Sequence, residues 1–295
     1  MAEEIGKIIS NGIDTYTKNF NLCVPFILNI ILSGLVVLII IAIGFLSILG
    51  SFSFNEYNSP EAISFAILSI LGQHMYEIAA LVIIGFLLLL LIASFFTSGA
   101  IGMARQATET GKSHISTMME SGKKNALNLF LAEILFLLLA LAGIVFIVPG
   151  AVNVDFNQPS TGVGLMLIGG FVLWMVYLLI ISVSLAVFRY ALVIDSHGPV
   201  GGILAGVDFF MKHMSDVILL FFVTIGVAIV FAIIDHVMNL IPVMNIIWFF
   251  LSFVISLCII YPIMTVWWVR LYMTRIGKQV YANDLLAHPN DLQEH

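Results

Sequence analysis

Long apolar stretches alternate with short polar connections along the whole chain. Six of these stretches are long enough to cross a bilayer, for which an α-helix needs about 20 residues. They occupy residues 24–48, 78–103, 126–148, 163–190, 217–234 and 245–271. The pattern therefore predicts an all-α integral membrane protein with six transmembrane helices, folded as a single membrane domain over residues 1–295. Pro262 lies inside the sixth stretch and is expected to kink it, because proline cannot donate the helical hydrogen bond.

A second pattern precedes the first, third and fifth stretches. It consists of an acidic residue four positions before a lysine: Asp14 and Lys18, Glu120 and Lys124, and Asp208 and Lys212. An isoleucine lies nine residues before each lysine, and the apolar residues around the pairs recur at helical spacing. Each pair therefore marks a short amphipathic helix, of the kind that lies in the plane of the membrane interface.

These three elements all precede spans that leave the same side of the membrane. They predict three units in a parallel repeat, each an interfacial amphipathic helix followed by a transmembrane hairpin. The units would cover residues 3–103, 113–190 and 199–273, followed by a polar tail at 274–295. The pairs stabilise their helices by a few tenths of a kcal/mol and place lysines near lipid phosphates. An alternative is a ring of three interfacial helices that gates a central site.

Composition supports the membrane and excludes other classes. The 295 residues are 61% hydrophobic and only 9% charged, whereas soluble domains carry about 25% charged residues. The basic residues are scattered singly and in pairs, which excludes a nucleic-acid-binding surface. All 11 Lys and Arg residues fall on the side that holds both termini. The positive-inside rule then predicts a multi-pass protein of the cell membrane with both termini in the cytoplasm.

Glu133 is the one carboxylate well inside a predicted span, roughly 10 Å from its cytoplasmic end at 1.5 Å per residue. A charge at the bilayer centre costs about 2.5–3.5 kcal/mol on insertion scales, so intramembrane charges usually have a partner. The following span runs antiparallel and brings Arg189 to the same half of the membrane. Glu133 is expected to pair with Arg189, to bind a cation or proton, or to serve a purely structural role.

Catalytic, cofactor and metal sites are not predicted. The Gly-x-Ser-x-Gly motif of hydrolases is absent, and Gly111-Lys112-Ser113 lacks the first glycine of a phosphate-binding loop, which is Gln106 here. The acids and histidines predicted on the outer side have no metal-ligand spacing: Glu56, Glu61, His74, Glu77, Asp155, Asp235 and His236. The sequence thus indicates no enzyme, no cofactor and no metal.

Three segments carry a resemblance to a known type of protein. They are Gly12-Ile-Asp-Thr-Tyr-Thr-Lys-Asn-Phe, Ala104-Arg-Gln-Ala-Thr-Glu-Thr-Gly-Lys, and Ala191-Leu-Val-Ile-Asp195 leading to Gly206-Val-Asp-Phe-Phe-Met-Lys. Over roughly residues 5–275 the chain is similar to uncharacterised, mostly archaeal six-span proteins related to the membrane domain of glycerophosphoryl diester phosphodiesterases. The catalytic acids and histidines of the phosphodiesterase domain are not found here. The resemblance therefore implies a membrane fold and no activity.

Two functions fit these features. The first is a non-enzymatic membrane module that organises lipid or a partner protein. The second is a small transporter or lipid-translocating protein that uses Glu133 and Arg189, and an enzyme acting on lipid head groups is a weaker third. The expected partners are membrane lipids; a protein partner is also compatible with these features, and nucleic acid is not expected. A polar cavity between the spans would favour the second function, whereas a packed apolar interior would favour the first.

Overall fold

The computed structural model describes residues 3–49, 72–154 and 160–280, together with residues 59, 64, 68 and 69. In this part of the chain all regular structure is helical. The α-helices are α1 (Ile5–Thr17), α2 (Val24–Leu49), α4 (Met75–Thr110), α5 (Ile115–Ala142), α6 (Val148–Ala151), α7 (Thr161–Ser184), α8 (Phe188–Ile194), α9 (Pro199–Lys212), α10 (Met214–Asn239), α11 (Pro242–Ile255) and α12 (Tyr261–Arg275). Short 3₁₀ turns form η1 (Phe20–Cys23) and η3 (Gly143–Phe146), and η4 (Ser256–Ile260) is a π-helical turn.

Six helical segments are long and apolar enough to cross a membrane, which confirms the six predicted spans. In the described part of the chain they are Phe20–Ser47, Met75–Thr110, Ile115–Phe146, Thr161–Ile194, Met214–Asn239 and Met244–Arg275. Within the fourth, α7 ends at Ser184 and α8 begins at Phe188, so the helix predicted over 163–190 is divided. Glu56, Glu61 and Asp155, and the tail from residue 281, lie outside the described residues.

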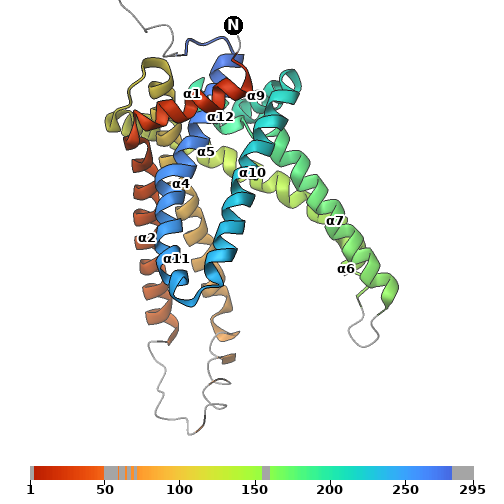
Figure 1. Cartoon of the computed structure of the whole chain (residues 1–295). Helices are drawn as coiled ribbons and strands as arrows, with labels where there is room; N and C mark the ends of the chain where they lie inside the picture. The colour runs from red at the N-terminus through yellow and green to blue at the C-terminus, as the bar shows by residue number, and fades with distance from the viewer. Residues whose placement is uncertain are drawn as a thin grey trace, which may run out of the picture.

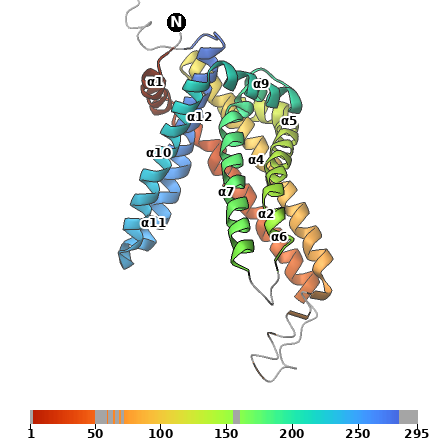
Figure 2. The same cartoon turned by 90° about the vertical axis from the view of Figure 1, so that its right-hand side faces the viewer.

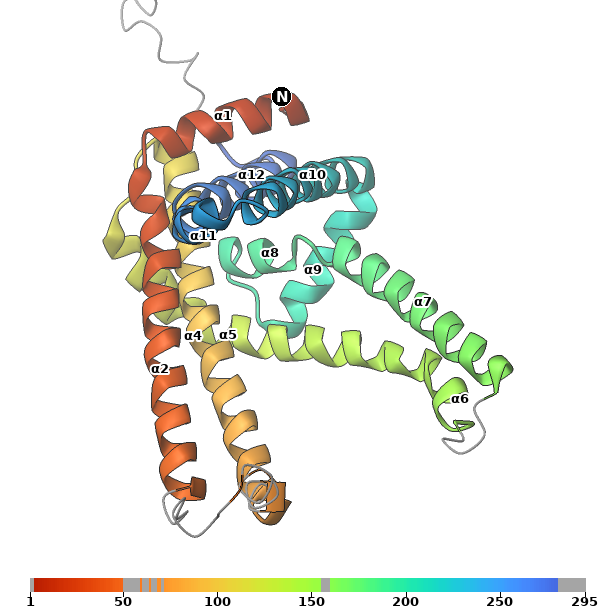
Figure 3. The same cartoon turned by 60° about the horizontal axis from the view of Figure 1, so that its bottom comes forward.

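The helices form three pairs that meet at one end of the molecule (Figure 1). Helices α1 and α9 lie across this end, which we call the basic end because the lysines and arginines belong to the elements and connections gathered there. α2 packs beside α4, and α10 beside α11. Figures 2 and 3 show α5 and α7 leaving the basic end in a different direction from these two pairs.

Helix α1 packs against the last span through a glycine. A methyl group on Gly12 would lie 2.4 Å from Cδ1 of Trp267, and the Trp267 indole N–H donates to the carbonyl of Ile9 at 3.1 Å. In α9 the corresponding glycine is Gly206, where a methyl group would lie 2.9 Å from Cα of Phe188 in α8. Both glycines precede the acidic residue of their repeat pair by two positions, so the first and third copies use the same kind of close contact.

The second copy differs. Helix α5 runs without interruption from Ile115 to Ala142, so the prediction of a separate amphipathic helix over 115–122 is wrong. No proline or left-handed residue interrupts the backbone there. Gly122 remains part of α5 and packs against Phe95 of α4. At the position of the other two glycines stands Met118, which is buried against Gly99 of α4. The arrangement of three similar units stays a prediction.

The regular α-helix of the last span is interrupted beside Pro262, where the sequence predicts a kink. The π-helical turn η4 immediately precedes α12, of which Pro262 is the second residue. Because Pro262 has no N–H, the carbonyl of Cys258 cannot receive the usual hydrogen bond from four residues later. The hydroxyl of Tyr16 in α1 donates to this carbonyl instead. Helix α1 therefore stabilises the irregular part of the last span.

At the end farthest from the basic end, α7 makes close contacts with η3 and with the end of α5. Gly170 lies so close to η3 that a methyl group would sit 2.3 Å from the carbonyl oxygen of Phe146, whereas a methyl group on Gly169 would meet nothing within 4 Å. Trp174 and Tyr177 donate hydrogen bonds of 3.2 and 2.7 Å to carbonyls at the end of α5. These contacts hold α7 against the far end of α5, and both helices diverge from the other two pairs.

Candidate functional site

A cavity of about 400 Å³ lies between α2, α4, α8, α10, η4 and α12. The polar or partly polar side chains in its lining are Asn29, Thr97, Arg189, Tyr190, Thr224, Tyr261, Thr265 and Trp268. Asn29 lies five residues into α2 and Thr224 ten residues into α10. At 1.5 Å per residue these positions are about 8 and 15 Å from the helix ends at the basic end. We call this space the central cavity; it lies within the half of the spans nearest to the basic end.

Arg189 and Glu133 meet beside this cavity. The Arg189 Nε donates to Oε1 of Glu133 at 2.5 Å, and Nη2 donates to Oε2 at 3.0 Å. The structure thus brings together the two intramembrane residues that the sequence singles out, Glu133 from α5 and Arg189 from α8. The Glu133 side chain is 13% exposed and the Arg189 side chain 45% exposed. The acid is therefore enclosed, while the guanidinium also faces open space.

The geometry of this pair leaves part of the guanidinium unused. A guanidinium has five N–H donors, of which the side-on contact with Glu133 uses the one on Nε and one on Nη2. Among the described residues, Nη1 of Arg189 has no hydrogen-bond partner, and the side chain lines the central cavity. The remaining edge, formed by Nη1 and the second hydrogen of Nη2, has the fork geometry that binds a carboxylate or phosphate at two points.

Other donors line the cavity without a protein acceptor. Within the described part of the chain, the amide nitrogen of Asn29, the hydroxyl of Tyr190 and the indole nitrogen of Trp268 donate no hydrogen bond to protein groups. The rings of Tyr190 and Trp268 stack at 6.2 Å with planes 19° apart, which fixes their orientation. Among the described residues that line the cavity there is no Asp or Glu. The cavity therefore combines one cation with several neutral donors, an arrangement suited to an oxygen-rich anion.

The three repeat pairs lie away from the central cavity. Lys212 and Asp208 form an ion pair of 2.7 Å in which both side chains are more than 60% exposed. Asp14 and Lys18 are exposed near the end of α1. These four residues thus lie on the surface of the basic end and not around a central site.

Glu120 and Lys124 line a second cavity of about 280 Å³, between α4, α5 and the end of α8. No ion pair joins them in the part of the chain that the structure describes. Arg105 also lines this cavity, but it donates to Glu109 at 2.8 Å and to the carbonyl of Ile194 at 2.9 Å. Acidic and basic side chains both line this second cavity, whereas the charged side chain in the described lining of the central cavity is that of Arg189.

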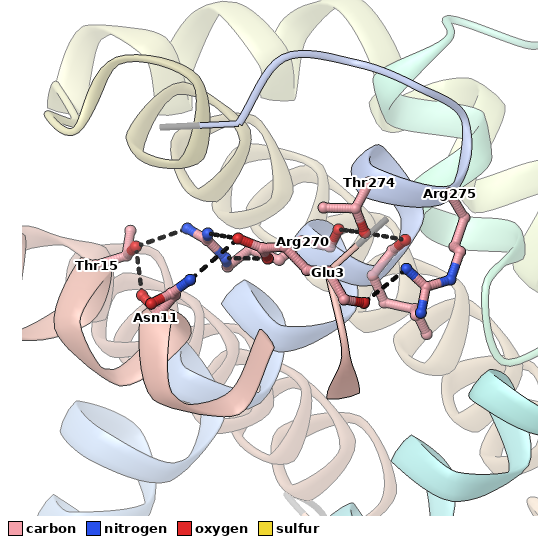
Figure 4. A network of polar contacts seen from close by, with 7 residues as sticks. Glu3, Asn11, Thr15, Arg270, Thr274 and Arg275 are labelled. Atoms are coloured by element: carbon pink, nitrogen blue, oxygen red, sulfur yellow. Dashed lines mark hydrogen bonds and ion pairs between the residues drawn. The ribbon is translucent and has the colours of Figure 1, made fainter. Parts of the chain in front are cut away.

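A network around Arg270 was not predicted from the sequence (Figure 4). Arg270 lies in α12 with its side chain only 1% exposed, and Nη2 donates to Oε1 of Glu3 at 2.7 Å while Nε donates to Oε2 at 3.4 Å. Nη1 donates to the hydroxyl of Thr15 at 3.2 Å, and the Asn11 amide donates to the Glu3 carboxylate at 3.0 Å. A charge inside the apolar run Val266–Met273 indicates that a partner exists. It does not indicate that the partner lies at the other end of the chain.

The same end of α12 is connected to two further elements. Arg275 donates to the backbone carbonyl of Glu3 at 2.8 Å and to Asp216, in the first turn of α10, at 2.6 Å. Asp195, which follows α8, accepts from Lys278 at 2.5 Å and from the Tyr272 hydroxyl at 2.5 Å. Burial alone would raise the pKa of Asp195, but the hydrogen bonds and charge of its partners outweigh burial and hold this pKa below its ordinary value.

Comparison with known proteins identifies a family. One family model matches residues 69–273, which is more than half of the chain. The chain belongs to the family described as Domain of unknown function (DUF7847). The DUF7847 match includes Glu133, Arg189, all of α10, and α12 as far as Met273, whereas α1 and α2 precede it. No curated protein and no solved structure matches the chain.

Proposed function

We propose that this DUF7847 protein is a non-enzymatic membrane protein that binds an anionic ligand in the central cavity and handles it within the membrane. The observation that carries this proposal is the free edge of Arg189, which stands among unpartnered donors in a cavity without lining carboxylates. An anion there would receive a two-point contact from the guanidinium and further hydrogen bonds from its neighbours.

The central cavity favours a protein that binds a ligand over one that only organises a partner protein. Its volume of about 400 Å³ falls within the roughly 300–1,000 Å³ typical of small-molecule sites. A module that only organises a partner protein needs no polar space between its spans. The described residues that line the cavity also include no Asp, Glu, His, Cys or Lys side chain that would act as a base or nucleophile. We therefore propose binding or translocation of the ligand, and not its chemical conversion.

The basic residues also bear on where the protein resides and how it lies in the membrane. We propose that it resides in the cell membrane with the basic end in the cytoplasm, because the lysines and arginines gather at that end. The relationship to the membrane domain of glycerophosphoryl diester phosphodiesterases, and the mostly archaeal distribution, are also proposals. They rest on the three sequence segments quoted above. The cytoplasmic leaflet supplies anionic lipid head groups at the basic end, so membrane lipids are the proposed partners.

Native mass spectrometry in mild detergent tests this function, with dioleoyl phosphatidylglycerol as the anionic probe and dioleoyl phosphatidylcholine as its zwitterionic counterpart. The unmodified protein is expected to retain one phosphatidylglycerol molecule and to bind phosphatidylcholine more weakly. Arg189→Ala should weaken phosphatidylglycerol binding about 10- to 100-fold, because a hydrogen bond to a charged group contributes about 1.5–3 kcal/mol. Glu133→Gln should bind at least as tightly as the unmodified protein, because the positive charge of Arg189 is then no longer offset by a carboxylate.

Two further variants guard against simpler explanations. Lys212→Gln removes a positive charge from the same end but outside the central cavity, and it should leave binding unchanged. Arg189→Ala combined with Glu133→Ala removes both charges, so it separates loss of binding from misfolding caused by an isolated Glu133. Equal phosphatidylglycerol binding by Arg189→Ala and the unmodified protein would refute the proposed function.

A further inference from the structure

A second, apolar space lies directly beside the central cavity. This groove of about 430 Å³ is lined by Val223, Gly226, Val227, Val230, Phe231 and Ile234 of α10 and by Ile260. Residues 223, 227, 230 and 234 recur at helical spacing and so form one stripe along α10. The absence of a side chain at Gly226 leaves room in the middle of this groove, since a methyl group there would meet nothing within 4 Å.

The groove and the central cavity share the same two walls. On α10, Thr224 lines the cavity and its neighbour Val223 lines the groove. On the other wall, Leu257 and Tyr261 line the cavity, and Ile260 between them lines the groove. No described residue lines both spaces, but their linings are neighbours on both helices, so a ligand that extends out of the central cavity along α10 would pass from polar to apolar surroundings.

The order and length of the two spaces match a lipid. The cavity lies nearer to the basic end, and the groove continues along α10 away from it, from Val223 to Ile234. At 1.5 Å per residue this stretch is about 16 Å long, close to half of a hydrocarbon core of about 30 Å. The groove begins about 14 Å from the N-terminal end of α10 and ends about 30 Å from it, so a lipid with its charged head in the cavity would place its acyl chain across the bilayer centre.

We propose that the ligand of the central cavity is an acidic glycerolipid whose head group binds beside Arg189 while one acyl chain lies in the groove along α10. This inference rests on the proposed function, because it takes the anion site at Arg189 as the position of the head group. It adds the chemical class of the ligand and its direction in the membrane. Affinity should then depend on chain length as well as on charge.

The test compares dioleoyl with dihexanoyl phosphatidylglycerol by native mass spectrometry on the full chain in mild detergent. The unmodified protein should bind the long-chain lipid more tightly, because only its acyl chain is long enough to fill the groove from Val223 to Ile234. Gly226→Leu fills the groove without touching the cavity, and the open space around Gly226 allows the new side chain to be accommodated. This variant should lose at least about tenfold in affinity for dioleoyl phosphatidylglycerol while binding the dihexanoyl form unchanged.

Gly34→Leu is the matched control, because Gly34 is exposed on α2 and also has nothing within 4 Å. It should bind both lipids as the unmodified protein does. If Gly226→Leu keeps the full affinity for the long chain, or if the unmodified protein binds both chain lengths equally, the groove assignment is wrong and the anion site stands. If Arg189→Ala binds both lipids as tightly as the unmodified protein, the proposed function itself fails.

Discussion

Replacing Glu3 by alanine should destabilise the protein more than replacing its partner Arg270 by methionine. The reason is the difference in burial within the ion pair, in which the Arg270 side chain is 1% exposed and the Glu3 side chain 15% exposed. Glu3 precedes α1, so without Arg270 its carboxylate can turn toward water. Without Glu3, the Arg270 guanidinium stays enclosed and loses both carboxylate contacts.

The structure sets the expected magnitudes. Breaking a buried ion pair typically costs about 3–5 kcal/mol, and Arg270 keeps its hydrogen bond to Thr15, so about 3 kcal/mol is expected for Glu3→Ala. With a melting-temperature shift of about 2–4 °C per kcal/mol for domains of 150–250 residues, this corresponds to a decrease of roughly 6–12 °C. Arg270→Met preserves apolar contacts and is expected to cost about 1 kcal/mol, or roughly 2–4 °C.

Thermal unfolding in one detergent at a fixed scan rate measures both variants, since the midpoint of an irreversible transition depends on the scan rate. Lys212→Gln serves as the control, because its ion pair with Asp208 is exposed and surface pairs contribute about 0–1 kcal/mol. The double variant Glu3→Ala with Arg270→Met should be more stable than Glu3→Ala alone. If Arg270→Met lowers the melting temperature as much as Glu3→Ala does, the argument from unequal burial is wrong.

Three further predictions concern other contacts. Tyr16→Phe should lower stability by about 1–3 kcal/mol, because it removes the hydroxyl that donates to the carbonyl of Cys258. The loss should be smaller in a Pro262→Ala background, where residue 262 regains its N–H. Equal losses in the two backgrounds, measured by a double-mutant cycle, would contradict this. Gly170→Leu should lower the melting temperature strongly, because it forces α7 away from η3, while Gly169→Leu should leave it nearly unchanged. For Asp195, whose folded pKa is lowered, the stabilisation is present above its ordinary pKa of 3.8 and is lost as pH falls toward the folded value. The stability difference between the unmodified protein and Asp195→Asn should therefore shrink below about pH 4 in unfolding measurements, and a constant difference would argue against the inferred shift.

The six spans could be predicted from the sequence because their cause is local. A helix that crosses hydrocarbon must be apolar over its own length whatever it packs against, so composition and periodicity contain the information. The meeting of Glu133 and Arg189 was predictable for a related reason. Antiparallel neighbouring spans place two charges at one depth, and an intramembrane charge needs a partner.

The second amphipathic element shows where local reasoning stops. The second copy, with Glu120 and Lys124, has the same charge spacing as the other two copies, but nothing in the backbone ends the helix before Lys123, and α5 continues. Charge spacing indicates which face of a helix is polar. It does not determine whether the helix turns before the next span, because that depends on contacts such as the one between Met118 and Gly99.

By itself, the sequence determined that the protein lies in a membrane, how many spans it has and which charges pair on adjacent spans. These properties follow from the composition of each segment and from the antiparallel order of neighbouring spans. Only the tertiary structure decided which groups face the central cavity. It also decided that the partner of Arg270 is Glu3, which lies 267 positions earlier in the chain. The free edge of Arg189 and the groove beside Thr224 likewise exist only once α2, α4, α8, α10 and α12 are packed together. Such features arise from contacts between distant segments, and the pattern within any one segment does not specify them.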